Sequence, residues 1–253
     1  MATIAVLGTL DSKGEEHAFV AGLIAARGHK PLLIDVGTGG PATVPPDITR
    51  EQVAAAIGLD FAALLARKDR GECVVAMTKA APALVAQLAA EGRIHGIISL
   101  GGGGGTAIGT AAMRALPLGF PKLMVSTMAS GNVAPYVGPT DIMMMHAVAD
   151  VAGLNAITRT VIGNAAHAAA GMAMNGIPMG GEAKRAVGLT MFGVTTACIT
   201  QIRHLIEGDC ECFVFHATGT GGQCLEKLID SQLITAARRR SSKGSYRSCC
   251  KPG

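Results

Sequence analysis

Aromatic residues are scarce in this chain of 253 residues, which has no tryptophan, two tyrosines and six phenylalanines. Their scarcity argues against the aromatic stacking platforms on which single-stranded nucleic acids bind. Charge is sparse as well: 16% of the residues are charged and 49% are hydrophobic, which excludes an intrinsically disordered chain and allows a large core. The 34 glycines are too irregularly spaced for collagen.

The positive charge of the chain lies in its C-terminal tail. Six Arg or Lys residues and no acid occur between Ala236 and Gly253. Without those six of the 22 basic residues, 16 basic residues stand against 18 acidic ones. The body is therefore mildly acidic, and we expect no nucleic-acid partner.

Signals for export or membrane insertion are lacking. The seven cysteines show no paired disulfide framework, which favours a reducing compartment. The N-terminus has no basic region followed by an apolar core, so we predict no signal peptide. Two uncharged stretches, 94–113 and 160–181, are interrupted by glycines or by polar residues and proline. We expect a cytoplasmic protein that does not contact a membrane.

Short apolar runs alternate with helical patterns, which is typical of an α/β fold. A strand at Thr3–Gly8, a helix from Glu15 to about Arg27 and a strand at Lys30–Val36 form a β-α-β unit. Such a unit implies a Rossmann-like parallel sheet with helices on both faces. Further strands are predicted at 96–100, 122–126 and 142–148, and helices near 49–57, 60–68, 71–90, 106–115 and 154–174.

The pattern starts again after a Gly/Pro-rich linker at 175–182. Strands at 186–191 and 212–216 are each followed by a helix, and two strands make a poor independent sheet. The abrupt change of composition after Ile234 indicates a truncated or frameshifted end. We therefore predict a nucleotide-binding lobe at 1–178, a partial second Rossmann-like lobe at 184–235 and a disordered basic tail at 236–253.

The strongest local signal is the segment Ser99–Thr106, with five consecutive glycines between a strand and a helix. Such a loop turns backbone N–H groups and a helix N-terminus toward an anion, and glycine lets phosphate approach closely. It is not a Walker A loop, because no Lys-Ser/Thr follows. The alternative is a turn that only allows tight packing of strand on helix.

Acidic and basic residues follow the first two predicted strands. Asp11 could hold Mg²⁺ and Lys13 could neutralise a phosphate, because ligands collect at the carboxyl ends of parallel strands. Alternatively, Asp11 caps the first helix and Lys13 is solvated. Asp35 lies where a ribose-binding acid belongs in dinucleotide folds, but the first turn lacks the glycine fingerprint, so a nicotinamide cofactor is disfavoured.

Two more loops complete the candidate site. The hydroxyls of 127–132 could join it, although Ser, Gly and Asn are also ordinary turn residues. The second glycine-rich loop, 217–222, would form an opposite wall if the two lobes face one another. Cys210, Cys212 and His216 share a strand face, but a zinc site would lack its fourth ligand.

Six segments, in this order, resemble the Tm-1-like ATP-binding family, also called the UPF0261 family. They are Gly8–Lys13, Ile34–Thr38, Ser99–Thr106, Val125–Gly131, Asp150–Asn155 and Phe215–Gly222. The resemblance covers Thr3 to Leu233. It implies two Rossmann-like lobes, ATP with Mg²⁺ as ligand, and self-association, with a homodimer as the expected form. It implies no defined reaction.

The predicted site combines the family motifs with phosphate-binding chemistry, and Asp11 is also the predicted metal ligand. Its residues are Thr9, Asp11, Lys13, Asp35, Gly37, Thr38, Gly101, Gly102, Gly103, Gly104, Gly105, Thr106, Thr127, Ser130, Gly131, Thr218, Gly219 and Thr220. No residue stands out as a catalytic base. Three alternatives stay open: an enzyme acting on another phosphorylated or carboxylated metabolite, a non-catalytic ATP-dependent interaction module, and a truncated chain that binds no ligand.

Overall fold

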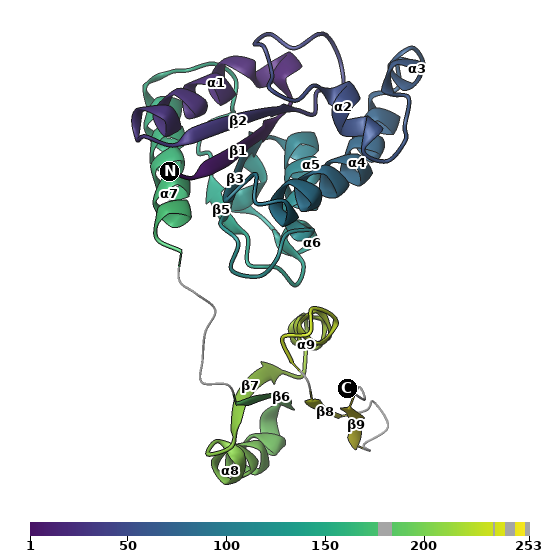
Figure 1. Cartoon of the computed structure of the whole chain (residues 1–253), viewed down its shortest axis with the longest axis vertical. Helices are drawn as coiled ribbons and strands as arrows, with labels where there is room; N and C mark the ends of the chain where they lie inside the picture. Colours follow the sequence, from purple (N-terminus) through teal and green to yellow (C-terminus); the bar gives the residue numbers. More distant parts are fainter. Residues whose placement is uncertain (177–183, 235, 241–245, 251–253) are drawn as a thin grey trace. The chain divides into compact units, whose positions relative to one another are not determined.

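The structure is a computed structural model of the whole chain (Figure 1). It describes residues 1–176, 184–234, 236–240 and 246–250, the last two ranges through their backbone alone. The chain divides into two units, Met1–Ile177 and Pro178–Gly253. Most of the predicted linker at 175–182 lies outside the described residues.

A five-stranded parallel sheet forms the centre of the first unit, with the order β2-β1-β3-β4-β5. Its strands are β1 (Thr3–Gly8), β2 (Lys30–Asp35), β3 (Gly96–Gly101), β4 (Lys122–Ser126) and β5 (Met143–His146). The chain winds outward from β1 to β2 and then returns to the other side of β1 to form β3. The strand order therefore reverses between β1 and β3, the point where doubly wound sheets bind ligands.

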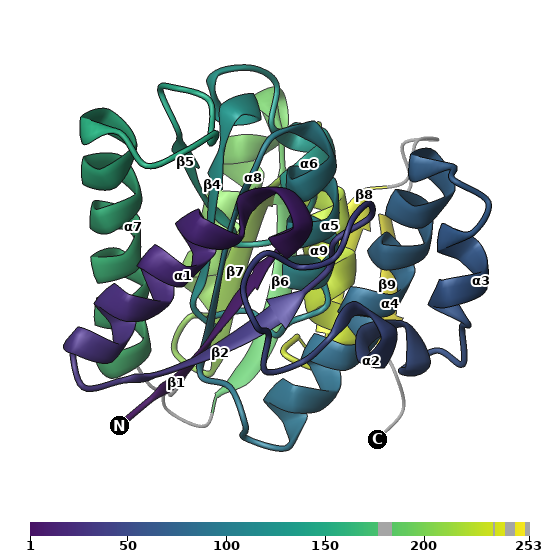
Figure 2. The same cartoon turned by 90° about the horizontal axis from the view of Figure 1, so that it is seen from above.

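Helices cover both faces of this sheet, as predicted (Figure 2). They are α1 (Leu10–Ala26), α2 (Arg50–Ala55), α3 (Phe61–Leu65), α4 (Arg70–Ala90), α5 (Gly103–Arg114), α6 (Ala134–Val137) and α7 (Ala156–Met174), with the 3-10 turn η1 (Thr127–Ser130). Side chains of β1 alternate between two cores: Ile4 and Val6 pack with α1 and α7, and Ala5 and Leu7 pack with α4 and α5.

The helix α4 is the one helix of the described chain that is long and apolar enough to cross a membrane. Its Met77, Ala81 and Val85 are fully buried in the core that α4 shares with α5 and β1. This packing explains the apolar character of α4 as that of a core helix in a globular α/β unit.

The start of α1 differs from the sequence prediction. We predicted a turn before Glu15, whereas α1 begins at Leu10 and bends at Lys13, whose φ of −138° is not helical. Lys13 and Glu16, at this bend, make the tertiary contacts described below. The predicted start of α2 is confirmed, because Thr49 caps it in a capping box with Gln52.

The second unit contains a four-stranded sheet with the order β7-β6-β8-β9. Its elements are β6 (Arg185–Met191), η2 (Gly193–Thr195), α8 (Thr196–Ile206), β7 (Cys210–His216), α9 (Gly221–Asp230), β8 (Ala236–Arg240) and β9 (Tyr246–Cys250). The tail predicted to be disordered instead supplies β8, which pairs with β6, and the antiparallel β9. This pairing satisfies backbone groups along β6 that would otherwise form an open sheet edge.

The core of the second unit is small. Leu225 and Ile234 form its buried cluster, with Phe213 and Phe215 packed partly against them, and Leu189 and Ile199 are also buried. Gly188 allows the close approach of α9 to β6, since a Cβ at this position would lie 2.4 Å from Leu225 Cδ1.

Candidate functional site

The predicted residues of the first unit all lie at the carboxyl edge of its sheet, at strand ends, in the turns that follow them, or in the first turns of α1 and α5. The parallel register aligns the strand ends, with Gly8 beside Asp35 and Gly101 beside Ser126. These residues form three groups. The first follows β3 and β4, the second follows β2, and the third lies at the start of α1.

The glycine loop after β3 leaves backbone N–H groups at the beginning of α5. The first helical bond runs from Thr106 N–H to the Gly102 carbonyl at 2.8 Å. The N–H groups of Gly103, Gly104 and Gly105 precede it and have no partner within the helix. Gly103 is exposed, and a Cβ added there meets no described atom within 4 Å. These amides are therefore placed to receive an anion.

The Thr106 side chain is bonded within the fold. It is fully buried, and its Oγ1 lies 2.6 Å from Ser126 Oγ, which also accepts the N–H of Met128 at 2.9 Å. The hydroxyl thus ties α5 to the end of β4. Thr127 lies beside the glycine loop, with its Oγ1 3.6 Å from the position of a Cβ on Gly102. Ser130 and Gly131 follow it and are exposed.

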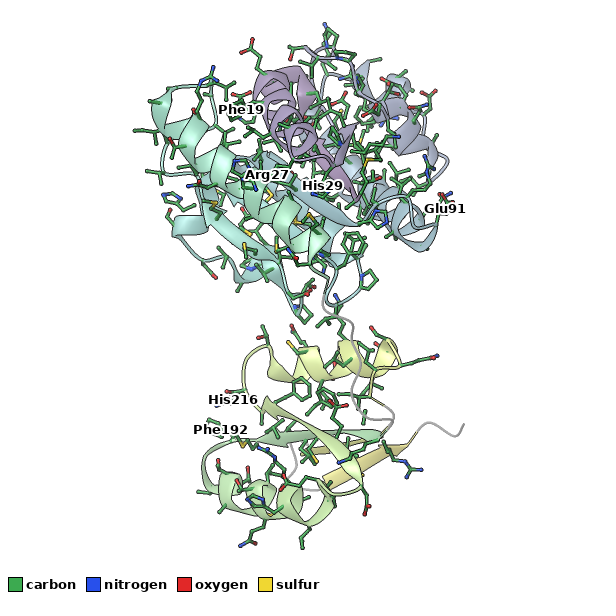
Figure 3. All side chains as sticks on the ribbon, turned by 60° about the vertical axis from the view of Figure 1, so that its left-hand side comes forward. Phe19, Arg27, His29, Glu91, Phe192 and His216 are labelled. Atoms are coloured by element: carbon green, nitrogen blue, oxygen red, sulfur yellow. The ribbon has the colours of Figure 1, made fainter. Side chains whose placement is uncertain are left out.

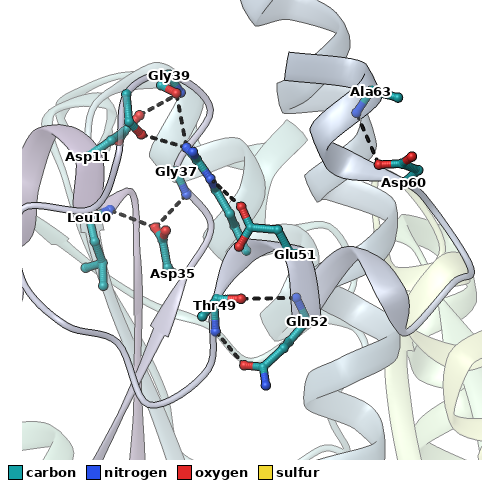
Figure 4. Close-up of polar contacts among 12 residues, drawn as sticks. Leu10, Asp11, Asp35, Gly37, Gly39, Thr49, Glu51, Gln52, Asp60 and Ala63 are labelled. Atoms are coloured by element: carbon teal, nitrogen blue, oxygen red, sulfur yellow. Dashed lines mark hydrogen bonds and ion pairs between the residues drawn. The ribbon is translucent and has the colours of Figure 1, made fainter. Parts of the chain in front are cut away.

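Asp35 links the ends of β1 and β2. Its Oδ1 accepts the N–H of Leu10 at 3.1 Å and that of Gly37 at 2.8 Å (Figure 4). Burial raises the pKa of Asp35, although the N–H groups of Gly37 and Leu10 act in the opposite direction. The residue is 2% exposed and Thr38 is 5% exposed, so neither side chain offers much surface to a ribose.

Asp11 does not cap α1. Its Oδ2 accepts the N–H of Gly39 at 2.7 Å, and its Oδ1 is buried without a hydrogen-bond partner among the described residues. A Cβ on Gly37 would lie 3.0 Å from Asp11 Cγ and 3.0 Å from Asp35 Oδ1, so a larger residue here would have to displace the two carboxylates by a few tenths of an ångström.

Arg50 is a residue of this group that the sequence did not reveal. Its Nη1 donates to the carbonyls of Gly39 at 3.1 Å and Gly40 at 2.6 Å. It begins α2, outside every turn that directly follows a strand. A basic residue at the start of a helix belongs to no sequence motif that predicts such a contact.

Lys13 and Glu16 join the start of α1 to the turn after β5, and His17 packs beside them. Lys13 Nζ donates to the Val151 carbonyl, and Glu16 Oε1 accepts the N–H of Gly153 at 2.6 Å. His17 is fully buried, and its Nδ1 donates to the Lys13 carbonyl at 2.6 Å. Burial lowers the pKa of His17. Lys13 is therefore bonded to backbone and not simply solvated. Thr9, at the head of this turn, is 7% exposed.

The second glycine-rich loop joins β7 to α9. Thr218 Oγ1 lies 2.7 Å from His216 Nδ1, and the His216 ring packs edge-on against Phe192 with 5.4 Å between centroids (Figure 3). Gly219 has a φ of 65°, and a Cβ on Gly221 would lie 2.0 Å from the His216 carbonyl oxygen. Thr218, Gly219 and Thr220 are exposed.

Metal-ligand clusters do not occur in the described part of the chain: no three His, Cys, Asp or Glu residues are grouped to hold an ion. The zinc alternative at Cys210, Cys212 and His216 therefore has no such cluster to support it. Asp11 remains as a single carboxylate with one unpartnered buried oxygen.

Together, the fold and the site define a doubly wound, Rossmann-like α/β unit. Backbone N–H groups without a helical partner lie next to its switch point, where the strand order reverses between β1 and β3. The chain belongs to the UPF0261 family. Residues 2–177 match the N-terminal domain of the "Uncharacterised protein family (UPF0261)", and residues 184–237 match its C-terminal domain. The family resemblance predicted from the six sequence segments is thus confirmed.

Relatives extend beyond the region that they share with this chain. A UPF0261 protein of Rhizobium meliloti is 50% identical over 235 residues, which cover 93% of this chain and 58% of the relative. The ToMV resistance protein Tm-1(GCR237) of Solanum lycopersicum is 39% identical over 171 residues, or 65% of this chain and 23% of that protein. The chain thus spans 58% of the length of the bacterial relative.

Solved structures give only a distant likeness. The S. aureus MnaA–UDP co-structure covers 91% of this chain and 67% of its own, with 10% identity and a TM-score of 0.33. A likeness at this level carries no argument about the ligand of this chain.

Proposed function

We propose that the unit Met1–Ile177 binds the phosphates of ATP, together with Mg²⁺, at the carboxyl edge of its sheet. The observation that carries this proposal is the set of N–H groups on Gly103, Gly104 and Gly105, which precede the first helical bond of α5 beside the β1/β3 switch point. The reaction, if ATP is turned over, stays unassigned.

Phosphate is the ligand chemistry that this loop fits best. Backbone amides and the positive end of the α5 dipole favour a negative charge, and exposed Gly103 lets an oxygen approach the backbone. The Thr127 hydroxyl lies next to the loop. In this proposal Lys13 exchanges the neutral carbonyl of Val151 for a phosphate oxygen, because a bond between two opposite charges is stronger than one from an ammonium to a neutral acceptor.

The residues present are compatible with Mg²⁺ that arrives with the nucleotide. Mg²⁺ commonly takes one or two carboxylates and completes its shell with phosphate oxygens and water. The unpartnered Oδ1 of Asp11 fits this requirement, and no larger ligand cluster exists among the described residues. When bound, Mg²⁺ would neutralise phosphate charge. Thr106 and Asp35 act through the fold in this proposal, because both are buried and bonded within it.

Isothermal titration with ATP, with and without Mg²⁺, tests the proposal. Gly103→Asp introduces a negative charge where a phosphate would lie, and Gly103→Ala is its matched control, because a Cβ at this position meets no described atom. We expect Asp to weaken binding roughly tenfold or more, the effect of losing about 1.5 kcal/mol, and Ala to leave it nearly unchanged. Absence of ATP binding by folded wild-type protein would contradict the proposal.

Competing ligands separate ATP from other anions. Inorganic triphosphate, ADP and AMP should compete in the order of their phosphate number if the glycine loop holds phosphate. Binding of a carboxylated or phosphorylated metabolite without any effect of ATP would instead favour the metabolite-enzyme alternative. Binding without turnover would favour the interaction module.

The family further implies self-association, and we propose a cytoplasmic homodimer. Light scattering of the purified chain measures its mass directly, and a monomer at all concentrations and nucleotide levels would exclude the dimer. A contribution of Thr218, Gly219 and Thr220 to the ligand is tested by Thr218→Ala in the same titration.

A further inference from the structure

Arg50 is held in one orientation beside the turn after β2. Its side chain is 13% exposed, its Nε donates to Glu51 Oε1 at 3.1 Å, and its guanidinium carbon lies 5.9 Å from the centroid of the Phe61 ring. These contacts restrict a long side chain that would otherwise sample many rotamers. The guanidinium is thus fixed over the backbone of Gly39 and Gly40.

This contact determines how the turn meets Asp11. Arg50 Nη1 donates to the carbonyls of Gly39 and Gly40, at 3.1 and 2.6 Å. The Gly39 N–H in turn donates to Asp11 Oδ2 at 2.7 Å (Figure 4). The contacts form a chain from Arg50 through Gly39 to the carboxylate.

The turn approaches Asp11 closely at two glycines. A Cβ on Gly37 would lie 3.2 Å from Asp11 Oδ1, and one on Gly39 would lie 3.0 Å from Asp11 Oδ2. Asp11 Oδ1 is nevertheless buried without a partner among the described residues. An unsatisfied buried oxygen in a closely packed turn calls for an explanation, such as an ion that occupies the place.

We propose that Arg50 is a positioning residue, which holds Asp11 through Gly39 so that Oδ1 is presented to the cation that accompanies a bound nucleotide. The inference rests on the proposed function and deepens it, because it assigns the metal dependence of binding to a residue outside the phosphate loop. Arg50 itself touches neither cation nor phosphate in this assignment.

The test compares Arg50→Met with Arg50→Lys. Met removes both the charge and the donors, whereas Lys keeps the charge but lacks the planar guanidinium. Arg67→Met is the matched control, because Arg67 is an exposed arginine of the same unit, 3.5 Å from Glu72. The measured quantity is the ratio of ATP affinities with and without Mg²⁺.

We expect Arg50→Met and Arg50→Lys to reduce this ratio roughly tenfold or more, the usual effect of losing a residue that orients a metal ligand. Affinity for ATP without Mg²⁺ should change less than about twofold, because the glycine loop is intact. Asp11→Asn should remove the effect of Mg²⁺ on ATP affinity. Adding Arg50→Met to the Asp11→Asn variant should then cause no further change. An unchanged ratio would overturn the proposal. A larger ratio in Arg50→Met would overturn it too, because it would indicate that the charge of Arg50 only repels the cation.

A second measurement separates this inference from the proposed function. Amide hydrogen exchange of Gly39 needs no nucleotide and reports its bond to Asp11. We expect faster exchange in Arg50→Met and unchanged exchange in Arg67→Met. If wild-type protein binds no ATP, the proposed function fails, and the positioning role is decided by this exchange together with binding of Mn²⁺ alone. Unchanged Gly39 exchange would overturn the role.

Discussion

The Nζ of Lys122 lies 2.6 Å from Asp141 Oδ1, although the Lys122 side chain is entirely shielded from solvent. The same ammonium donates to the carbonyls of Pro117 at 2.7 Å and Phe120 at 2.9 Å. Lys122 begins β4, so this cluster lies at the amino edge of the sheet, opposite to the candidate site. A buried charge is tolerated here because its three protons all have acceptors.

Lys122→Met should destabilise the first unit without affecting its ligand. Lys122→Met should cost about 1–3 kcal/mol, because the carbonyls of Pro117 and Phe120 lose their donor, whereas the remaining Asp141 carboxylate is 37% exposed and can be solvated. Asp141→Asn should cost more, up to about 3–5 kcal/mol, because it leaves the fully shielded Lys122 ammonium without its counter-charge. Urea unfolding measures both values. Equal stabilities of Lys122→Met and wild type would contradict the expectation.

His17 should make the stability of the chain sensitive to mild acid. Burial lowers its pKa in the folded state below the ordinary value of 6.5. The unfolded chain therefore binds more protons, and stability is lost as the pH falls below about 6.5, by up to about 1.4 kcal/mol per pH unit until the folded-state pKa is reached. Denaturant unfolding of wild type between pH 7.5 and 5 measures this slope.

His17→Asn is the variant that isolates this contribution, since its amide keeps an N–H donor for the Lys13 carbonyl. The slope between pH 6.5 and 5 should decrease in His17→Asn. It should persist in His204→Asn, which alters a histidine whose side chain is 67% exposed. The same slope in both variants would assign the acid sensitivity to other groups.

Thr106→Val should lower stability and leave ATP affinity unchanged. The variant removes the 2.6 Å contact with Ser126 and leaves a buried hydroxyl without its partner, at a cost of about 1–3 kcal/mol. Thr106→Ser keeps the hydroxyl and should lose less. Thermal unfolding and ATP titration measure the two effects. A selective loss of ATP affinity at wild-type stability would restore the predicted phosphate contact of Thr106.

The sequence predicted the elements of the first unit well because their signals are local. The apolar run at Thr3–Gly8 and the capping box of Thr49 with Gln52 each lie within a few residues. The side-chain roles at the site depend on contacts between distant segments. Asp11 meets Gly39 across 28 positions, and Lys13 meets Val151 across 138. These contacts form only once the strands have taken their places in the sheet, so they cannot be predicted from a single sequence.

Asp35→Asn should be tolerated, and Asp35→Ala should not. Asn keeps an oxygen for the N–H groups of Leu10 and Gly37, at 3.1 and 2.8 Å in the wild type, and removes a charge whose pKa is raised by burial. The folded-state pKa of Asp35 lies above the ordinary 3.8, so the folded protein loses this proton at a higher pH than the unfolded chain. The free energy of unfolding therefore decreases as the pH rises from 3.8 toward neutrality.

The stability of Asp35→Asn at pH 7 should therefore equal or exceed that of wild type, and Asp35→Ala should lose about 2–3 kcal/mol through two unpaired N–H groups. Urea unfolding measures both. ATP affinity should be unchanged in Asp35→Asn, since this side chain is 2% exposed and holds β1 to the turn after β2. A tenfold loss of ATP affinity in stably folded Asp35→Asn would instead support the predicted contact of this carboxylate with the ribose.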